Sequence, residues 1–151
     1  MTSAAGAARR GRAGILLALL GWAVAASGEE RVYKVVVNAT NPVSEIKREQ
    51  LATLFLNRSS RWSHGPAAAP VDQSLNSPVR TAFCKEVLRL SSSGVQSYWQ
   101  NRIRTDREIP PPVKSSDDEV IAHAEKNKGA VGYVSAAASL PASVKVLAIV
   151  E

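Results

Sequence analysis

The chain of 151 residues carries a formal net charge of +6, is 45% hydrophobic and contains one cysteine. One cysteine excludes a scaffold of internal disulfides, and a chain of this length allows one ordinary domain with a real core. About half of the basic excess lies in the first twelve residues, so the remainder is too mild to indicate a nucleic-acid-binding face.

The N-terminus is typical of a secretory signal peptide. Three arginines within the first twelve residues are followed by the apolar stretch AGILLALLGWAVAA at 13–26. Small residues suit cleavage after Ala26, which divides the chain into a signal peptide, 1–26, and one domain, 27–151. The apolar stretch is short for a membrane span. We therefore expect a periplasmic or secreted protein with no membrane span after cleavage.

Strands alternate with amphipathic helices along the rest of the chain. In chain order, the patterns predict a strand at 32–38, a helix at 46–56, a short strand near 70–73, helices at 78–90 and 95–104, a helix after Ser116, and strands at 130–134 and 144–150. Ser116 and Glu119 form a capping box at the start of the last helix, and Gly129 is the predicted cap at its end. This alternation indicates an α/β layered domain.

The turn SLNSPVRTAF, residues 74–83, is the first candidate site. Ser77 is a good N-cap and Pro78 fits the first helical position. The first N–H groups of a helix lack partners and attract anions. The turn can therefore bind a small anion through Val79 and Arg80, or it can serve only as a cap, and the cap is the favoured interpretation.

A second candidate is the polar loop NRSSRWSHG, residues 57–65. Arg58 and Arg61 flank Trp62, and arginine and tryptophan are enriched at protein interfaces. The loop is a candidate partner surface, and its arginines could also add charge to the anion site. The alternative, which we favour, is that Trp62 folds back as an anchor and the arginines are solvated.

The usual signatures of catalysis and metal binding are missing from the sequence. Cys84 falls on or beside the apolar face of its helix, which favours a buried, inert thiol over a nucleophile. His64 and His123 have no recognised metal-ligand spacing with each other or with Asp72 or Asp117. We predict no enzyme activity, no metal and no cofactor.

The order of motifs resembles one known family. The segments VVVNATNPVSEIKREQLATLFLNRSSRW, VDQSLNSPVRTAF, YW and KGAVGYV look like the second lobe of the phosphate-binding protein of bacterial phosphate ABC transporters. The likeness covers about residues 33–134. It implies a single three-layer α/β/α lobe of the type II periplasmic-binding-protein kind, with a mixed sheet.

The resemblance also implies where phosphate would bind. Ser77 matches the serine of the family's Ser-Gly-Thr turn, whereas Pro78 replaces the glycine and Val79 replaces the threonine. Gln73 stands where the family has an arginine. These departures remove an N–H donor, a hydroxyl and a charge from the anion site. The resemblance therefore implies at most weak binding of phosphate or another small anion, at Gln73, Ser77, Val79 and Arg80.

Two functions follow from these observations. The first is a solute-binding-protein-like module of the periplasm that binds a small anion weakly. The alternative is a ligand-free interaction or adaptor domain of the bacterial envelope, whose partner is an envelope protein contacted through the loop of Arg58, Arg61 and Trp62.

Overall fold

The computed structural model describes residues 30–151, so the predicted signal peptide and its cleavage point lie outside the described residues. Its strands are β1 (Tyr33–Asn38), β2 (Glu45–Lys47), β3 (Ala69–Pro70), β4 (Asp72–Gln73), β5 (Val113–Lys114), β6 (Ala130–Ser135) and β7 (Val144–Val150). Its helices are α1 (Arg48–Phe55), α2 (Pro78–Phe83), the π-helical turn η1 (Cys84–Leu88), α3 (Ser92–Asp106) and α4 (Asp117–Lys126). No helix among these residues is long and apolar enough to span a membrane.

A five-stranded mixed sheet with the order β2-β7-β1-β6-β3 forms the centre of the fold. The central strand β1 is antiparallel to both of its neighbours, β6 and β7. The edge strands β2 and β3 run parallel to β7 and β6, respectively. A separate parallel pair, β4 and β5, carries the chain toward α2 and α4.

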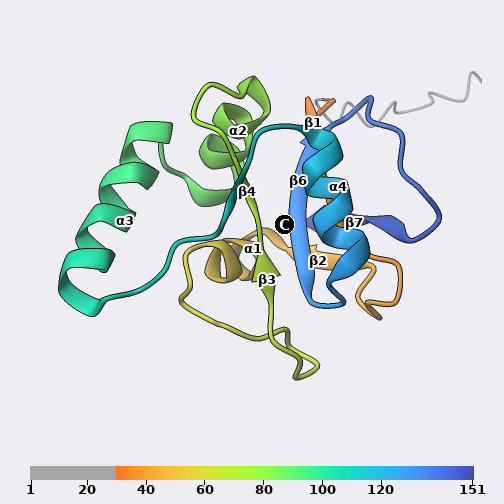
Figure 1. Cartoon of the computed structure of the whole chain (residues 1–151), viewed down its shortest axis with the longest axis horizontal. Coiled ribbons are helices and arrows are strands. Elements are labelled where there is room, and N and C mark those ends of the chain that lie inside the picture. The colour runs from red at the N-terminus through yellow and green to blue at the C-terminus, as the bar shows by residue number, and fades with distance from the viewer. Residues whose placement is uncertain (1–29) are drawn as a thin grey trace, which may run out of the picture.

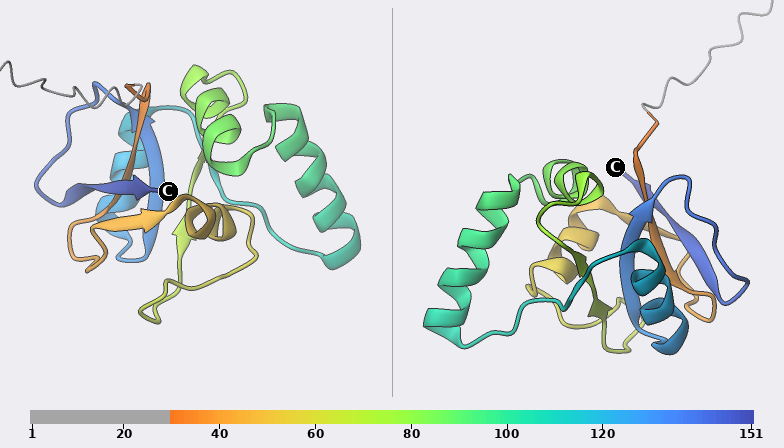
Figure 2. Two further views of the ribbon diagram at one scale, coloured as in Figure 1. Left: turned by 180° about the vertical axis from the view of Figure 1, so that it is seen from behind. Right: turned by 45° about the horizontal axis from the view of Figure 1, so that its top comes forward.

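Helices cover both faces of this sheet (Figure 1). Successive side chains of β1 point to opposite faces. Val35 and Val37 pack in the larger core with α1, α2, η1 and α3, whereas Val36 packs in the smaller core under α4. The expected three-layer α/β/α arrangement with a mixed sheet is therefore confirmed. Figure 2 shows α3 at one end of the molecule, joined to the rest by an extended segment.

Most predicted elements are present, with boundary changes that have local causes. Ile46 belongs to the edge strand β2, so α1 is shorter than predicted. Helix α3 begins at Ser92, before the predicted start at 95, because Ser91 is the N-cap and its Oγ accepts a hydrogen bond from the Gly94 N–H at 3.0 Å.

The predicted cap at Gly129 is wrong. Helix α4 ends with Asn127 in an extended conformation, and Gly129 does not adopt a positive φ. A glycine is needed there for another reason. A Cβ on Gly129 would stand 2.1 Å from the carbonyl oxygen of Ala67, so only a residue without a side chain permits this approach of two backbone segments.

Candidate anion site

The turn between β4 and α2 has the local structure that its sequence predicts. Ser77 is the N-cap of α2, and its Oγ accepts a hydrogen bond from the Arg80 N–H at 3.3 Å. Pro78 occupies the first helical position, where a missing N–H costs nothing. The Thr81 N–H donates to the Ser77 carbonyl at 3.2 Å. Among the described residues, the N–H of Val79 is left as the free donor of the first turn.

Gln73 joins this cap to the sheet. Its side chain is buried, and its Oε1 accepts a hydrogen bond from Ser77 Oγ at 2.8 Å. Its Nε2 donates to the Tyr133 carbonyl at 2.8 Å and to Asp117 Oδ1 at 3.0 Å. Both ends of the Gln73 amide are therefore already bonded within the protein.

Arg80 is the charged centre of the cluster and is only 4% exposed. Its Nε lies 3.2 Å from Asp72 Oδ2, with which it forms an ion pair. The other Asp72 oxygen accepts hydrogen bonds from the Tyr133 hydroxyl and from the Gln73 N–H. Arg80 Nη1, by contrast, is buried and has no hydrogen-bond partner. The guanidinium group thus retains one buried donor without a partner.

The charges around this cluster limit what it can bind. Arg80 supplies one positive charge, whereas Asp72 and Asp117 bring two carboxylates, and a like charge weakens anion binding. Burial, followed by the nearby Asp72 carboxylate, raises the pKa of Tyr133 well above its ordinary value. The Tyr133 hydroxyl therefore stays protonated and serves Asp72 as a donor.

Hydrogen bonds link Gln73, Ser77 and Arg80 at this turn, and Val79 lies in the first turn of α2. The role of Tyr133 and of the two aspartates in surrounding them was missed, because these residues come from β4, α4 and β6. The positions of the two aspartates were the one usable signal in the sequence. Asp72 lies five residues before the predicted N-cap Ser77, and Asp117 lies at the start of a predicted helix. Both could have been recognised as partners for Arg80 and Gln73.

The loop after α1 is separate from this cluster. Trp62 is 3% exposed, and its Nε1 donates a hydrogen bond to the Gly129 carbonyl at 2.9 Å. Trp62 is therefore a buried anchor, which is the alternative that the sequence favoured. Arg58 and Arg61 remain exposed, and Arg61 Nη1 bonds the Gly65 carbonyl at 2.9 Å. The loop lies at the opposite end of the molecule from α2 (Figures 1 and 2), so its arginines add no charge to the anion site.

Cys84 is buried in the larger core, and burial raises its pKa to about 11. At neutral pH the group is therefore a thiol, which is a poor nucleophile. We expect Ellman's reagent to modify native Cys84 at least about a hundredfold more slowly than Cys84 in the urea-unfolded chain, because reaction requires the core to open. Equal rates in the native and unfolded protein would contradict this burial.

No group of three His, Cys, Asp or Glu side chains within residues 30–151 is arranged to bind a metal ion. His123 lies on α4, with Nε2 3.4 Å from the Ala69 carbonyl oxygen. His64 stacks loosely beside Trp62, with 6.1 Å between the ring centroids. The two histidines therefore belong to different parts of the fold.

Comparison with known proteins finds likeness in structure alone. No family model and no curated protein matches the chain. A phosphate ABC transporter substrate-binding protein from Clostridium perfringens, solved with bound phosphate, is 16% identical with a TM-score of 0.61. The matched part is 78% of this chain and 44% of the Clostridium protein. An ABC-type phosphate transport receptor from Vibrio cholerae is 25% identical with a TM-score of 0.55. The matched part is 78% of this chain and 45% of the Vibrio protein.

PstS from Borrelia burgdorferi is 14% identical with a TM-score of 0.61. The matched part is 78% of this chain and 47% of the Borrelia protein. The chain spans somewhat less than half the length of each of these three proteins. The likeness runs through the mixed sheet and the helices on both of its faces, which is the architecture that the order of sequence motifs implied. This protein therefore has the fold of one lobe of the substrate-binding proteins of phosphate ABC transporters.

Proposed function

We propose that this protein is a solute-binding-protein-like module that acts outside the cytoplasmic membrane and binds phosphate, or another small oxyanion, weakly. The proposal is supported by a fold shared with a protein that was solved with bound phosphate. The site is suggested by the buried Nη1 of Arg80, which has no hydrogen-bond partner. Arg80 lies on α2, and the first turn of this helix leaves the Val79 N–H free. These are the donors that an oxyanion requires.

Binding at this turn is weak for two physical reasons. The carboxylates of Asp72 and Asp117 already occupy the charged and amide donors of Arg80 and Gln73, so an incoming anion must compete with them. Selective capture also requires several desolvated, charge-assisted hydrogen bonds around the anion. The described residues supply few free donors at this turn, so an affinity in the millimolar range is expected.

Titration calorimetry with phosphate, sulfate and acetate tests this proposal. Changing Asp72 to Asn removes the charge that competes for Arg80, so we expect phosphate binding to tighten by about three- to tenfold. Asp118→Asn is the matched control, because Asp118 is an exposed neighbour on α4 that does not contact the cluster. Its phosphate affinity is expected to equal that of the unchanged protein.

Arg80→Met provides the complementary test, because it keeps an unbranched apolar stem and removes the guanidinium group. We expect phosphate binding to disappear in this variant, with folding checked by circular dichroism at the titration temperature. The proposal is wrong if no saturable heat appears at tens of millimolar phosphate, or if a folded Arg80→Met protein binds phosphate unchanged. The alternative of an interaction domain is not proposed, because Trp62, on which it relied, is buried.

A further inference from the structure

A pocket of about 520 Å³ lies where β1 begins, β7 ends and η1 ends. Its helical wall comes from the α2–η1 segment, with Ala82 on α2, Glu86 on η1 and Arg89 in the left-handed conformation that ends η1. Arg80 points from a different face of this segment into the cluster described above. The pocket volume is ample for a small ligand.

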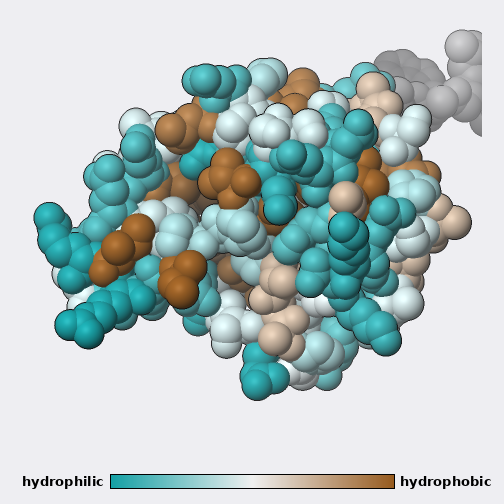
Figure 3. Space-filling model, in the orientation of Figure 1, coloured by the Kyte–Doolittle hydropathy of each residue, from teal (hydrophilic) through white to brown (hydrophobic). Residues whose placement is uncertain are grey.

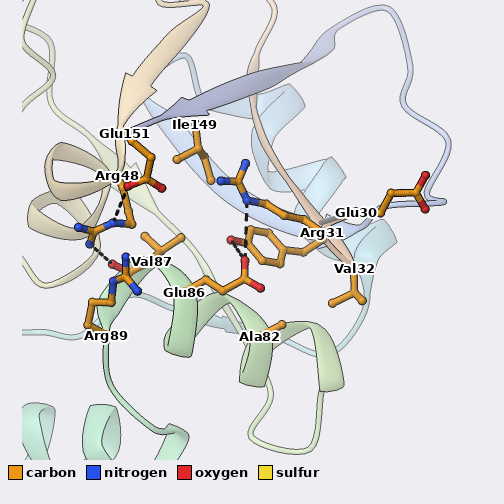
Figure 4. Close-up of a pocket in the computed structure, with 11 residues that line it drawn as sticks. Glu30, Arg31, Val32, Arg48, Ala82, Glu86, Val87, Arg89, Ile149 and Glu151 are labelled. Carbon is orange, nitrogen blue, oxygen red and sulfur yellow. Dashed lines mark hydrogen bonds and ion pairs between the residues drawn. The ribbon is translucent and has the colours of Figure 1, made fainter. Parts of the chain in front are cut away.

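One end of this pocket is basic. Arg48, at the start of α1, and Arg89, after η1, lie close together there (Figure 4). Arg48 Nε is buried without a hydrogen-bond partner and lies 3.6 Å from an oxygen of Glu151, whose side chain is 74% exposed. Among the described residues, Arg89 forms no ion pair and is exposed. Arg48 Nη2 also pairs with the exposed Glu49, so a ligand carboxylate can reach both guanidinium groups by displacing the solvated carboxylates of Glu151 and Glu49.

The other end of the pocket is organised around Glu86. Its Oε2 accepts a hydrogen bond from the Tyr33 hydroxyl at 2.8 Å and lies 3.8 Å from Arg31 Nε. The Tyr33 pKa is raised above its ordinary value by burial and then by its bond to Glu86, so the tyrosine remains a donor. These contacts fix the Glu86 carboxylate, which is half-exposed at the pocket and free to accept further hydrogen bonds from a cation.

The remaining wall is apolar, and the charged side chains of the lining are balanced in sign. Apolar surface comes from Val87, Ile149 and the methyl groups of Ala82 and Val32. The charged lining consists of Arg31, Arg48, Arg89, Glu30, Glu86 and Glu151. A lining with equal numbers of each sign gives no advantage to a multiply charged anion such as phosphate. It suits a ligand that carries both signs itself.

We propose that this pocket binds a free α-amino acid with an apolar side chain. Arg48 and Arg89 bind its carboxylate, Glu86 accepts hydrogen bonds from its ammonium group, and Val87 and Ile149 contact its side chain. Glu86, on η1, and Arg89, which follows η1, both line this pocket, so one small zwitterion can contact groups of both signs. This site is distinct from the anion site around Arg80.

Calorimetric titration of the full-length protein with L-leucine tests the proposal. We expect saturable binding of L-leucine and none of leucinamide, which lacks the carboxylate, or of N-acetyl-leucine, which lacks the ammonium group. Arg89→Ala and Glu86→Gln should each weaken leucine binding about tenfold or more, because each removes a charge-assisted hydrogen bond. Arg104→Ala, on the exposed face of α3, is the matched control and should bind leucine unchanged.

The two sites are separated by crossed titrations. Arg89→Ala should keep the weak phosphate binding assigned to Arg80, and Arg80→Met should keep leucine binding. The amino-acid proposal is wrong if leucine gives no saturable heat at tens of millimolar, if leucinamide and N-acetyl-leucine bind as well as leucine, or if Arg89→Ala has no effect. Loss of phosphate binding alone would overturn only the function proposed for the Arg80 site.

Discussion

Replacing Asp72 with alanine is expected to lower the free energy of unfolding by about 3–5 kcal/mol. Arg80 is 4% exposed and Asp72 is its only ion-pair partner among the described residues, so the change leaves a buried guanidinium charge without compensation. It also removes the acceptor of the Tyr133 hydroxyl and the Gln73 N–H. Urea unfolding followed by tryptophan fluorescence measures the loss.

A double variant separates the unpaired charge from lost packing. Adding Arg80→Met to Asp72→Ala removes the stranded charge, so the double variant should be more stable than Asp72→Ala alone. Glu49→Ala, which removes an exposed carboxylate from its ion pair with the partly buried Arg48, is the matched control and should change stability by less than about 1 kcal/mol. A loss below about 1 kcal/mol for Asp72→Ala would show that the buried pair contributes little to stability.

Replacing Gly129 with alanine is expected to destabilise the fold by about 3 kcal/mol or more, because the new Cβ would stand 2.1 Å from the Ala67 carbonyl oxygen. The two backbone segments cannot separate without loss of other bonds. The Gly129 carbonyl accepts hydrogen bonds from the Ala69 N–H and from Trp62 Nε1, each at 2.9 Å. Thermal unfolding should show a midpoint lower by about 10 °C or more.

Lys128→Ala provides the control for the Gly129 change. Lys128 is the exposed neighbour of Gly129, so its truncation should leave the unfolding midpoint within about 2 °C of that of the unchanged protein. A Gly129→Ala protein as stable as Lys128→Ala would mean that the loop of Ala67 shifts freely. In that case the anchoring of this loop through Trp62 would not be rigid.

Local chemistry explains which parts of the fold could be predicted. The β-branched runs that form β1 and β7 fit strands, and their alternation with amphipathic helices indicates an α/β domain. Ser77 and Ser116 act as caps within three residues of their partners, with Oγ accepting from Arg80 N–H and from Glu119 N–H. Interactions of such short range leave patterns in the sequence that can be read directly. The two short strands at 45–47 and 113–114 leave no such pattern, because each depends on its neighbour in a sheet.

The candidate site also has a part that the sequence predicts and a part that depends on tertiary structure. The sequence by itself determined the α/β class, the cap at Ser77 and the gathering of Gln73 and Arg80 near one turn. Only the tertiary structure decided that Asp72 and Tyr133 enclose Arg80, and that Trp62 is buried. Gln73 meets Tyr133 across a separation of 60 residues, and Trp62 meets Gly129 across 67. Contacts over such separations depend on how the helices pack on the sheet, and no local pattern of residues specifies that packing.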